Sequence, residues 1–338
     1  MPKMATTTSV VAAAAASVLA LVGVKRVCSA ITAQRGLTLP SLRAANLPKC
    51  AYPEDYYPGG QYAELSYGET HYFMFGPEDG KKTVFVHGLS TPASVYNDVA
   101  RHMAANGCRV LLYDLYSRGY SVGPAVDHTP VFYVTQLHEL LKHVGWKQCN
   151  FVGLSLGGGI VAAYAHRFPE TVLSLNFVAP AGLLSPKEIP WVGKIFSLPY
   201  SEEIFSHNSI KGYFSGKNVA SMRGEFKDLK EIPACIDEAC EILKLQFSHH
   251  AGYARGLMST LKMFPFSALR AQFATAQAQS FPVQVVWGTK DTVIPGTTVD
   301  VIQELIPRIR VTKVEGATHS IVMTHPKVII RSLEDYIV

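Results

Sequence analysis

Short apolar runs recur along the chain from about residue 61 onward, and mixed stretches of helical length separate most of them. The short runs have the length and composition of buried strands. We predict strands at residues 63–67, 70–75, 82–86, 109–113, 149–152, 173–178, 283–287 and 310–314, the first two joined by a turn at residues 67–69. We predict helices at residues 95–105, 131–144, 157–167 and 325–337. Strands that alternate with helices form βαβ units, so the pattern predicts an α/β fold whose mostly parallel central sheet carries helices on both faces.

The alternation stops between Pro180 and Pro282. This stretch contains helical patches rich in phenylalanine, tyrosine and methionine but no clear buried strand. We therefore predict an inserted helical cap at about residues 181–281, over the carboxyl edge of the sheet. Most of its large apolar side chains are expected to pack the cap onto the core, and some to line an apolar ligand pocket. The pair His249 and His250 is expected to consist of surface or packing residues.

The N-terminal segment, residues 1–53, differs in composition from the folded domain predicted at residues 54–338. Val10 to Val24 is nearly all apolar, which is marginal in length for a membrane-spanning helix. A cleaved secretory signal fits the same run, and an organellar transit peptide fits the absence of acidic residues before residue 54. We favour a membrane anchor or uncleaved signal, and hence a membrane-associated protein. Secretion after cleavage and import into an organelle stay open as alternatives.

Residues 31–57 are largely polar and contain three prolines, Pro40, Pro48 and Pro53, and Pro58 follows directly. We interpret this stretch as a linker between the apolar segment and the folded domain.

Charge is unevenly distributed along the chain. The whole sequence has 31 basic and 26 acidic residues, a formal net charge of +5. The basic residues before Glu54 are Lys3, Lys25, Arg26, Arg35, Arg43 and Lys49, and no acidic residue precedes Glu54, so the remainder is close to neutral. Nucleic-acid binding needs a concentrated basic surface, so we expect no nucleic-acid partner.

The six cysteines have no CxxC spacing and no paired-histidine partner, so we expect no metal site. Cys235 and Cys240 are close enough in sequence to form a disulfide in an oxidising compartment. With so few cysteines in a chain of 338 residues, we expect two unpaired thiols instead.

A glycine-rich turn follows the predicted strand at residues 149–152. Its sequence, Gly153-Leu154-Ser155-Leu156-Gly157, precedes an apolar helix. The pattern Gly-x-Ser-x-Gly between a strand and a helix is typical of a nucleophile elbow, which exposes a serine hydroxyl at the top of a sheet. The turn is so sharp that side chains at Gly153 and Gly157 are expected to collide with neighbouring backbone.

Two later loops offer the partners that a nucleophilic serine needs. Asp291 follows the strand predicted at residues 283–287, and His319 follows the strand predicted at residues 310–314. A histidine takes the proton of the serine hydroxyl, and an acid orients the histidine. Because ligands of open α/β sheets bind at the carboxyl ends of the strands, we expect Ser155, Asp291 and His319 to meet in one crevice.

The sequence resembles the α/β-hydrolase superfamily of capped serine hydrolases over roughly residues 61–338. The resemblance rests on matching motifs in the expected order: His87-Gly88, Asp114 to Ser121, Gly153-x-Ser155-x-Gly157-Gly158, Trp287-Gly288-x-x-Asp291 and Gly316-x-x-His319. One loop departs from the family pattern D-x-R-G-x-G-x-S, because Ser117 and Arg118 stand in place of the first glycine and the residue after it.

The resemblance implies a role for each matched residue. Ser155 is the nucleophile, His319 the general base and acid, and Asp291 the residue that orients the histidine. The backbone N–H groups of Leu89 and Leu156 occupy the family's oxyanion-hole positions. Structural support is expected from His87, Gly88, Gly153 and Gly157.

No cofactor motif is present in the sequence, and the three glycines after Leu156 belong to the elbow helix rather than to a dinucleotide fingerprint. We predict a serine hydrolase that cleaves carboxylic esters, with lipid-like acyl esters as substrates and no cofactor. The alternatives left open are a small-ester or peptide-amide hydrolase, a C–C bond hydrolase, a cofactor-free haloperoxidase-like enzyme, and a hydrolase-fold binding protein without turnover.

Overall fold

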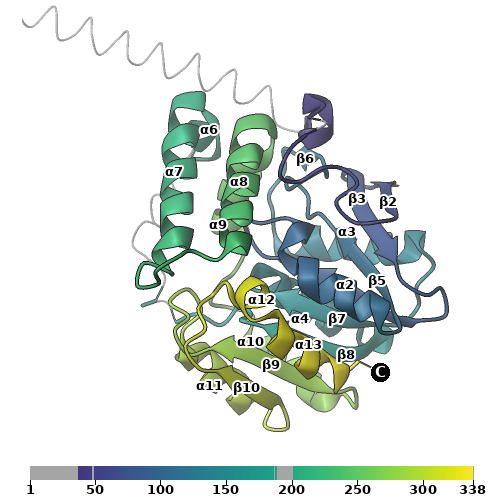
Figure 1. Ribbon diagram of the computed structural model, residues 1–338. Helices are drawn as coiled ribbons and strands as arrows, with labels where there is room; N and C mark the ends of the chain where they lie inside the picture. The colour runs from purple at the N-terminus through teal and green to yellow at the C-terminus, as the bar shows by residue number, and fades with distance from the viewer. Residues whose placement is uncertain (1–36, 48, 186, 189–200, 338) are drawn as a thin grey trace, which may run out of the picture. The chain divides into compact units, whose positions relative to one another are not determined.

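The computed structural model describes residues 37–47, 49–185, 187–188 and 201–337 (Figure 1). The apolar run from Val10 to Val24, on which the anchor, signal and transit interpretations depend, lies outside the described residues. Among the helices of the described ranges, none combines the length and the apolar character needed to cross a membrane.

One sheet organises the described part of the chain. Its eight strands lie in the order β10-β9-β8-β7-β4-β5-β3-β2. In chain order they are β2 (Gly60–Leu65), β3 (Gly68–Phe75), β4 (Lys81–Val86), β5 (Cys108–Tyr113), β7 (Cys149–Leu154), β8 (Val172–Val178), β9 (Val283–Gly288) and β10 (Arg310–Val314). The β2–β3 and β3–β5 pairs are antiparallel and all other neighbouring pairs are parallel. The predicted mostly parallel sheet is confirmed, and each predicted strand overlaps an observed one.

The first hairpin differs from the prediction at its turn. Gly68 already pairs with Leu65 in the β2–β3 ladder. The turn therefore consists of Ser66 and Tyr67 rather than of residues 67–69. A separate short ladder joins β1 (Thr38–Leu39) to β6 (Gly123–Pro124).

Helices cover both faces of the sheet (Figure 1). The alternation of side chains along β5 shows the two faces, because Val110 and Leu112 belong to one apolar cluster and Leu111 and Tyr113 to the other. The first cluster includes residues of α2 (Asn97–Ala105), α12 (Ile321–Thr324) and α13 (Pro326–Glu334). The second includes residues of α3 (Pro130–His143), α4 (Leu156–Arg167), α10 (Arg270–Thr275) and α11 (Gly296–Leu305). The sequence pattern did not predict α11.

Four helices between β8 and β9 pack on one another (Figure 1, green). They are α6 (Ser201–Ser206), α7 (Asn208–Gly224), α8 (Ala234–His249) and α9 (Tyr253–Met263). The later part of the insertion, residues 264–281, packs on the core rather than on these helices, because Phe264, Phe273 and Phe281 belong to the large apolar cluster of the core. The name cap is used below for the segment α6 to α9, residues 201–263. His250 is buried and His249 is exposed.

The interpretation of residues 31–57 as a linker is wrong for the described part of that range. Leu42, Tyr52 and Tyr57 are each at most 2% exposed and belong to the core. The reason is aromatic content, since buried tyrosines remove a large apolar surface from water and their hydroxyls find partners.

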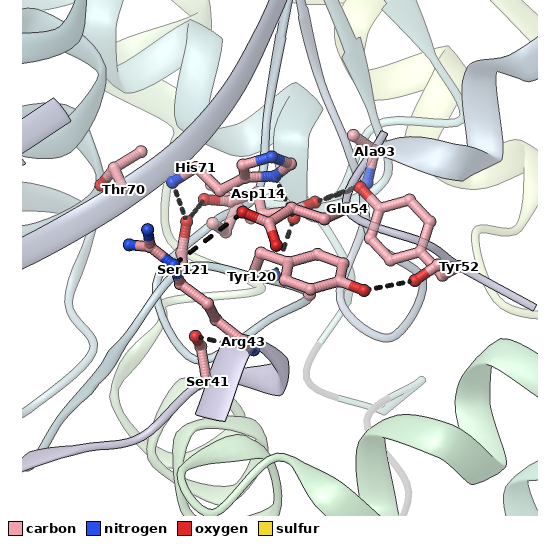
Figure 2. Close-up of polar contacts among 12 residues, drawn as sticks. Ser41, Arg43, Tyr52, Glu54, Thr70, His71, Ala93, Asp114, Tyr120 and Ser121 are labelled. Carbon is pink, nitrogen blue, oxygen red and sulfur yellow. Dashed lines mark hydrogen bonds and ion pairs between the residues drawn. The ribbon is translucent and has the colours of Figure 1, made fainter. Parts of the chain in front are cut away.

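The carboxylate of Asp114, after β5, ties this segment to the core (Figure 2). It accepts hydrogen bonds from Tyr52 Oη at 2.9 Å, from the N–H of Ala93 at 3.0 Å and from the N–H of Tyr120 at 2.9 Å. His71 Nδ1 lies 3.4 Å away. Burial alone would raise the pKa of Asp114, but the hydrogen bond and charge of His71 outweigh it and the pKa is lowered.

Candidate active site

Ser155 occupies the turn between β7 and α4 in a strained backbone conformation. Its φ is 52° and its ψ is −116°. A positive φ is uncommon for a residue with a Cβ atom and is retained mainly where function requires it. A Cβ atom at Gly153 would collide with the backbone of Gly157 and Gly158, and one at Gly157 would collide with the carbonyl oxygen of Val86. The predicted steric reason for these glycines is confirmed.

The structure brings together the three predicted triad residues from three strand ends. His319 Nε2 lies 3.1 Å from Ser155 Oγ, and His319 Nδ1 lies 2.8 Å from Asp291 Oδ2. These residues are separated by up to 164 positions in the sequence. Their side chains therefore form one continuous hydrogen-bonded chain from carboxylate to hydroxyl.

The carboxylate of Asp291 is held in one orientation. Its Oδ1 accepts hydrogen bonds of 2.8 Å from the backbone N–H groups of both Val293 and Ile294. These bonds leave Oδ2 for the imidazole of His319, and the carboxyl group itself is fully buried. A carboxylate only accepts hydrogen bonds, so Nδ1 of His319 carries the proton and the lone pair of Nε2 faces Ser155.

The loops that carry Asp291 and His319 lie against one another. Lys290 N–H donates to the carbonyl oxygen of Ala317 at 2.9 Å, and Gly316 N–H donates to Thr289 Oγ1 at 2.9 Å. These bonds cross between the end of β9 and the end of β10, which are parallel neighbours in the sheet. The register of the two strands thus sets the distance between the acid and the histidine.

The two backbone N–H groups predicted as oxyanion-hole donors belong to the two turns that flank Ser155. Leu156 is the first residue of α4, and the first N–H groups of a helix have no acceptor within it. The N–H of Leu89 has no hydrogen-bond acceptor among the described residues. Leu89 follows Gly88, where an added Cβ atom would lie 3.5 Å from Ser155 Cβ. The loop after β4 therefore passes directly beside the serine.

His87 makes two hydrogen bonds that define its tautomer. Its Nε2 accepts from the N–H of Leu115 at 2.9 Å, so the proton resides on Nδ1, which donates to the carbonyl oxygen of Gly88 at 2.8 Å. Burial disfavours the charged imidazolium and lowers the pKa of His87 to about 4. The neutral ring holds the backbone of the loop and has no free proton to offer a substrate.

The loop after β4 is also held by polar side chains that sequence reasoning missed. The buried Arg118 donates from Nε to the carbonyl oxygen of Leu89 at 3.0 Å and from Nη2 to Thr260 Oγ1 of α9 at 3.1 Å. The next carbonyl oxygen, that of Ser90, accepts from Gln246 Nε2 and from Tyr253 Oη, each at 2.9 Å. Arg118 lies with Ser117 in the loop where the chain departs from the family pattern, and that departure is the only signal of this role in the sequence.

An apolar cavity of about 220 Å³ lies within the cap. Its lining consists of Phe205, Phe214, Lys217, Asn218, Phe247, Ala254, Leu257, Met258 and Leu261. Most of the apolar lining belongs to a cluster against which Leu89 packs. The cluster that supplies most of the lining is therefore also in contact with Leu89, one of the two predicted oxyanion-hole donors.

A second cavity, of about 810 Å³, is lined by residues of the N-terminal segment and by Arg101 and Tyr120. None of the predicted site residues lines either cavity, so cavity size alone does not locate the active site; the cavity in the cap is distinguished by its apolar lining. Within the described residues, no three histidine, cysteine, aspartate or glutamate side chains are arranged to hold a metal ion. The thiols of Cys235 and Cys240 are both free.

A family model described as serine aminopeptidase, S33, matches residues 78–325. The chain belongs to this family of α/β hydrolases. The match includes the elbow, the Asp291 loop and the His319 loop, so the expected α/β-hydrolase fold and hydrolase class are confirmed.

Relatives of this α/β hydrolase differ in what their names say they do. An uncharacterized protein of Mycobacterium tuberculosis is 25% identical over 71% of this chain and 70% of its own. Monoacylglycerol lipase ABHD6 of Mus musculus is 21% identical over 82% of this chain and 83% of its own. The crystal structure of bromoperoxidase from Bacillus anthracis superposes with a TM-score of 0.68 at 19% identity, over 82% of this chain and 99% of that one. At that identity the structural likeness shows the fold alone.

Proposed function

We propose that this α/β hydrolase is a serine esterase that cleaves carboxylic esters with lipid-like acyl chains through Ser155, His319 and Asp291. The observation that carries the proposal is the pair of distances around His319, 3.1 Å to the serine hydroxyl and 2.8 Å to the carboxylate. Both are within the reach required for proton transfer and for orientation of the base.

In the first half-reaction, Ser155 Oγ attacks the ester carbonyl carbon while His319 Nε2 takes the hydroxyl proton. The carbonyl oxygen becomes an oxyanion, and the N–H groups of Leu89 and Leu156 donate to it. When the tetrahedral intermediate collapses, the bond to the leaving alkoxide breaks and His319 protonates that oxygen. The products of this step are the free alcohol and an acyl-enzyme on Ser155.

In the second half-reaction, a water molecule attacks the acyl-enzyme carbonyl as His319 accepts its proton. A second tetrahedral intermediate collapses, the bond from carbonyl carbon to Ser155 Oγ breaks, and His319 returns the proton to the serine. The free acid leaves and the starting enzyme is restored. The carboxylate of Asp291 stabilises the imidazolium form in both halves.

The acyl preference is argued from the cavity in the cap. Its 220 Å³ is below the range of about 300–1,000 Å³ for sites that enclose a whole drug-sized ligand. It therefore suits one part of a substrate, and its apolar lining suits a hydrocarbon chain. Leu89 packs against the cluster that supplies most of this lining, which supports an acyl chain bound near the proposed oxyanion-hole donor. Similarity to a protein named monoacylglycerol lipase supports the same substrate class.

The nucleophile assignment is tested with a fluorophosphonate probe, which labels activated serines. We expect labelling of the wild-type protein and its loss in Ser155→Ala. Ser221→Ala, which removes an exposed hydroxyl on α7, is the matched control and should label normally. Labelling that persists in Ser155→Ala would overturn the assignment.

The substrate class is tested with p-nitrophenyl esters from acetyl to palmitoyl and with a p-nitroanilide of the preferred acid. We expect kcat/KM to rise with chain length and the anilide to react far more slowly. Activity confined to the acetyl ester would remove the lipid-like preference, and faster cleavage of the anilide would favour an amide hydrolase.

Membrane association through the N-terminal apolar segment belongs to the same proposal. Its support is the composition of Val10 to Val24. Full-length protein and a variant lacking residues 1–30 are compared by flotation with phospholipid vesicles. We expect only the full-length protein to float, and equal behaviour would remove the anchor.

A further inference from the structure

The cap makes a direct hydrogen-bonded contact with the loop that carries His319. Glu225, the C-cap residue directly after α7, accepts two hydrogen bonds on Oε2 from Ser320, one of 3.3 Å from the backbone N–H and one of 3.0 Å from Oγ. Ser320 directly follows His319 and precedes α12. A carboxylate that accepts from two donors at once makes a strong, oriented contact.

The N–H that Glu225 binds belongs to the peptide group joining His319 to Ser320. Because a peptide group is planar and rigid, fixing this N–H restricts rotation about the Cα–C bond of His319. The two hydrogen bonds of the imidazole, to Asp291 and to Ser155, require that backbone orientation. Glu225 therefore restrains the peptide group immediately after the general base His319, although it makes no direct contact with Ser155 in this network.

A second contact joins the same two elements. Met323 of α12 packs against a small apolar cluster of the cap that contains Phe226 and Ile236. The carbonyl oxygen of Met323 also accepts from Cys235 Sγ at 3.6 Å. The helix after His319 is thus bound to the cap by packing as well as by Glu225.

The other side of the histidine loop is held by the core. Contacts to the Asp291 loop fix residues 316 and 317, on the N-terminal side of His319. The contact from Glu225 fixes residue 320, on its C-terminal side. The histidine lies between one anchor in the core and one in the cap.

We propose that Glu225 is a positioning residue that holds His319 within reach of Ser155, so that displacement of the cap disengages the general base. The proposal rests on the proposed function. It couples the cap to catalysis. A substrate that displaces α7 also displaces Glu225, and with it His319, the residue that activates the serine. Misplacing a catalytic group by about 1 Å can cost about 100-fold in rate.

The test compares two replacements of Glu225 that differ in one property. Glu225→Gln keeps an acceptor oxygen, which can still receive both bonds from Ser320, whereas Glu225→Met has similar length and no acceptor. We expect Glu225→Met to lower kcat by about 10- to 100-fold with KM nearly unchanged, since the lost interaction serves the chemical step. Glu225→Gln is expected to restore kcat to within about threefold of wild type. Glu231→Met, at an exposed carboxylate of the same segment, is the matched control and should behave as wild type.

A second variant keeps the proposal testable if Glu225→Met does not fold. Ser320→Ala removes one of the two donors, so by itself it should lower kcat with KM nearly unchanged, and wild-type kcat in this variant would overturn the proposal. Where Glu225→Met folds, Ser320→Ala should lower kcat less than Glu225→Met does. In the double variant the two effects should not add, because both changes act on one contact. Unchanged kcat in Glu225→Met, a change confined to KM, or full additivity with Ser320→Ala would overturn the positioning role.

The outcome also separates this proposal from the one on which it rests. All variants are assayed with the best p-nitrophenyl ester beside Ser155→Ala. If Ser155→Ala retains activity, the proposed function fails whatever Glu225 does. If Ser155→Ala is inactive while Glu225→Met is fully active, only the role of Glu225 is overturned.

Discussion

The imidazole of His87 and the carbonyl oxygen of Gly88 are joined by a hydrogen bond of 2.8 Å. In a trans peptide the carbonyl and the following N–H point in opposite directions, so this bond turns the N–H of Leu89 away from the histidine. The relationship makes His87 an orienting group for one proposed donor of the oxyanion hole, and in the neutral ring it requires the Nδ1–H tautomer.

Replacing His87 by alanine should therefore reduce catalysis. We expect kcat of His87→Ala to fall by about 100-fold, the effect typical of losing one oxyanion-hole donor. Substrate binding should change less, because the donor acts mainly on the transition state. Steady-state kinetics of kcat and KM check this, with the thermal unfolding midpoint as a measure of folding. A folded variant with wild-type kcat would contradict the role.

Filling the cavity of the cap should shift the chain-length preference. Ala254 is 3% exposed and lines the cavity from α9. We expect Ala254→Phe to lower kcat/KM for the palmitoyl ester by at least about 10-fold, since excluding two methylenes forfeits about 1.6 kcal/mol. Cleavage of the acetyl ester should stay near wild type. The matched control is Ala220→Phe on the exposed side of α7. An equal loss for both esters would mean that the cavity does not hold the acyl chain.

Acid should destabilise the folded protein through buried histidines. Burial lowers the pKa of His87 and of His250 to about 4, and it lowers the pKa of His128 well below its usual value. In the unfolded chain the pKa of histidine is about 6.5, so between these values the unfolded state binds more protons. The free energy of unfolding is therefore highest above pH 6.5 and falls as the pH drops toward 4. Each histidine contributes about 1.4 kcal/mol per pH unit in that window.

Urea unfolding between pH 7.5 and 4.5 measures this slope. In the folded core, His250 Nε2 donates to the carbonyl oxygen of Ser121 and His250 Nδ1 accepts from the N–H of Gly252, each at 3.0 Å. His250→Gln should lower stability at every pH but also reduce the slope by one proton. A slope that is flat in wild type, or unchanged in the variant, would contradict the assignment of neutral buried histidines.

Two glycine-to-alanine substitutions should have opposite effects on stability. A Cβ atom at Gly157 has no room beside the carbonyl oxygens of Val86 and His87, so we expect Gly157→Ala to lower the free energy of unfolding by about 3 kcal/mol. A Cβ atom added at Gly216, inside α7, would have no atom within 4 Å of it apart from its chain neighbours and the backbone of its own helix. Gly216→Ala should raise stability by about 1 kcal/mol, because alanine favours a helix. The urea concentrations at half-unfolding of the two variants test this prediction. A shift in the same direction for both variants would refute it.

The sequence was informative wherever the signal is local. The strands show as apolar runs, and Ser155, Asp291 and His319 each follow such a run directly, so their convergence at one sheet edge could be predicted. The glycines of the elbow carry their steric reason in their spacing.

What could not be predicted depends on contacts between distant positions. Glu225 and Ser320 are 95 residues apart, and neither has a motif of its own. Tyr52 and Asp114 are 62 residues apart, and the prolines near Tyr52 suggested a linker although its aromatic ring packs in the core. Hydrophobic periodicity indicates which side chains are buried, but it does not indicate which polar atoms they will meet.

The guanidinium of Arg118 bears on how this enzyme could be re-engineered. It bonds at once to Leu89 of the core and to Thr260 of α9, and Gln246 and Tyr253 reach the same loop from neighbouring cap positions. A cap transplanted from another hydrolase would remove Thr260 from this buried cation, and it would remove Gln246 and Tyr253, the two side-chain donors to the carbonyl oxygen of Ser90. The cap is therefore not an exchangeable module, and a successful chimera has to carry these three polar side chains with it.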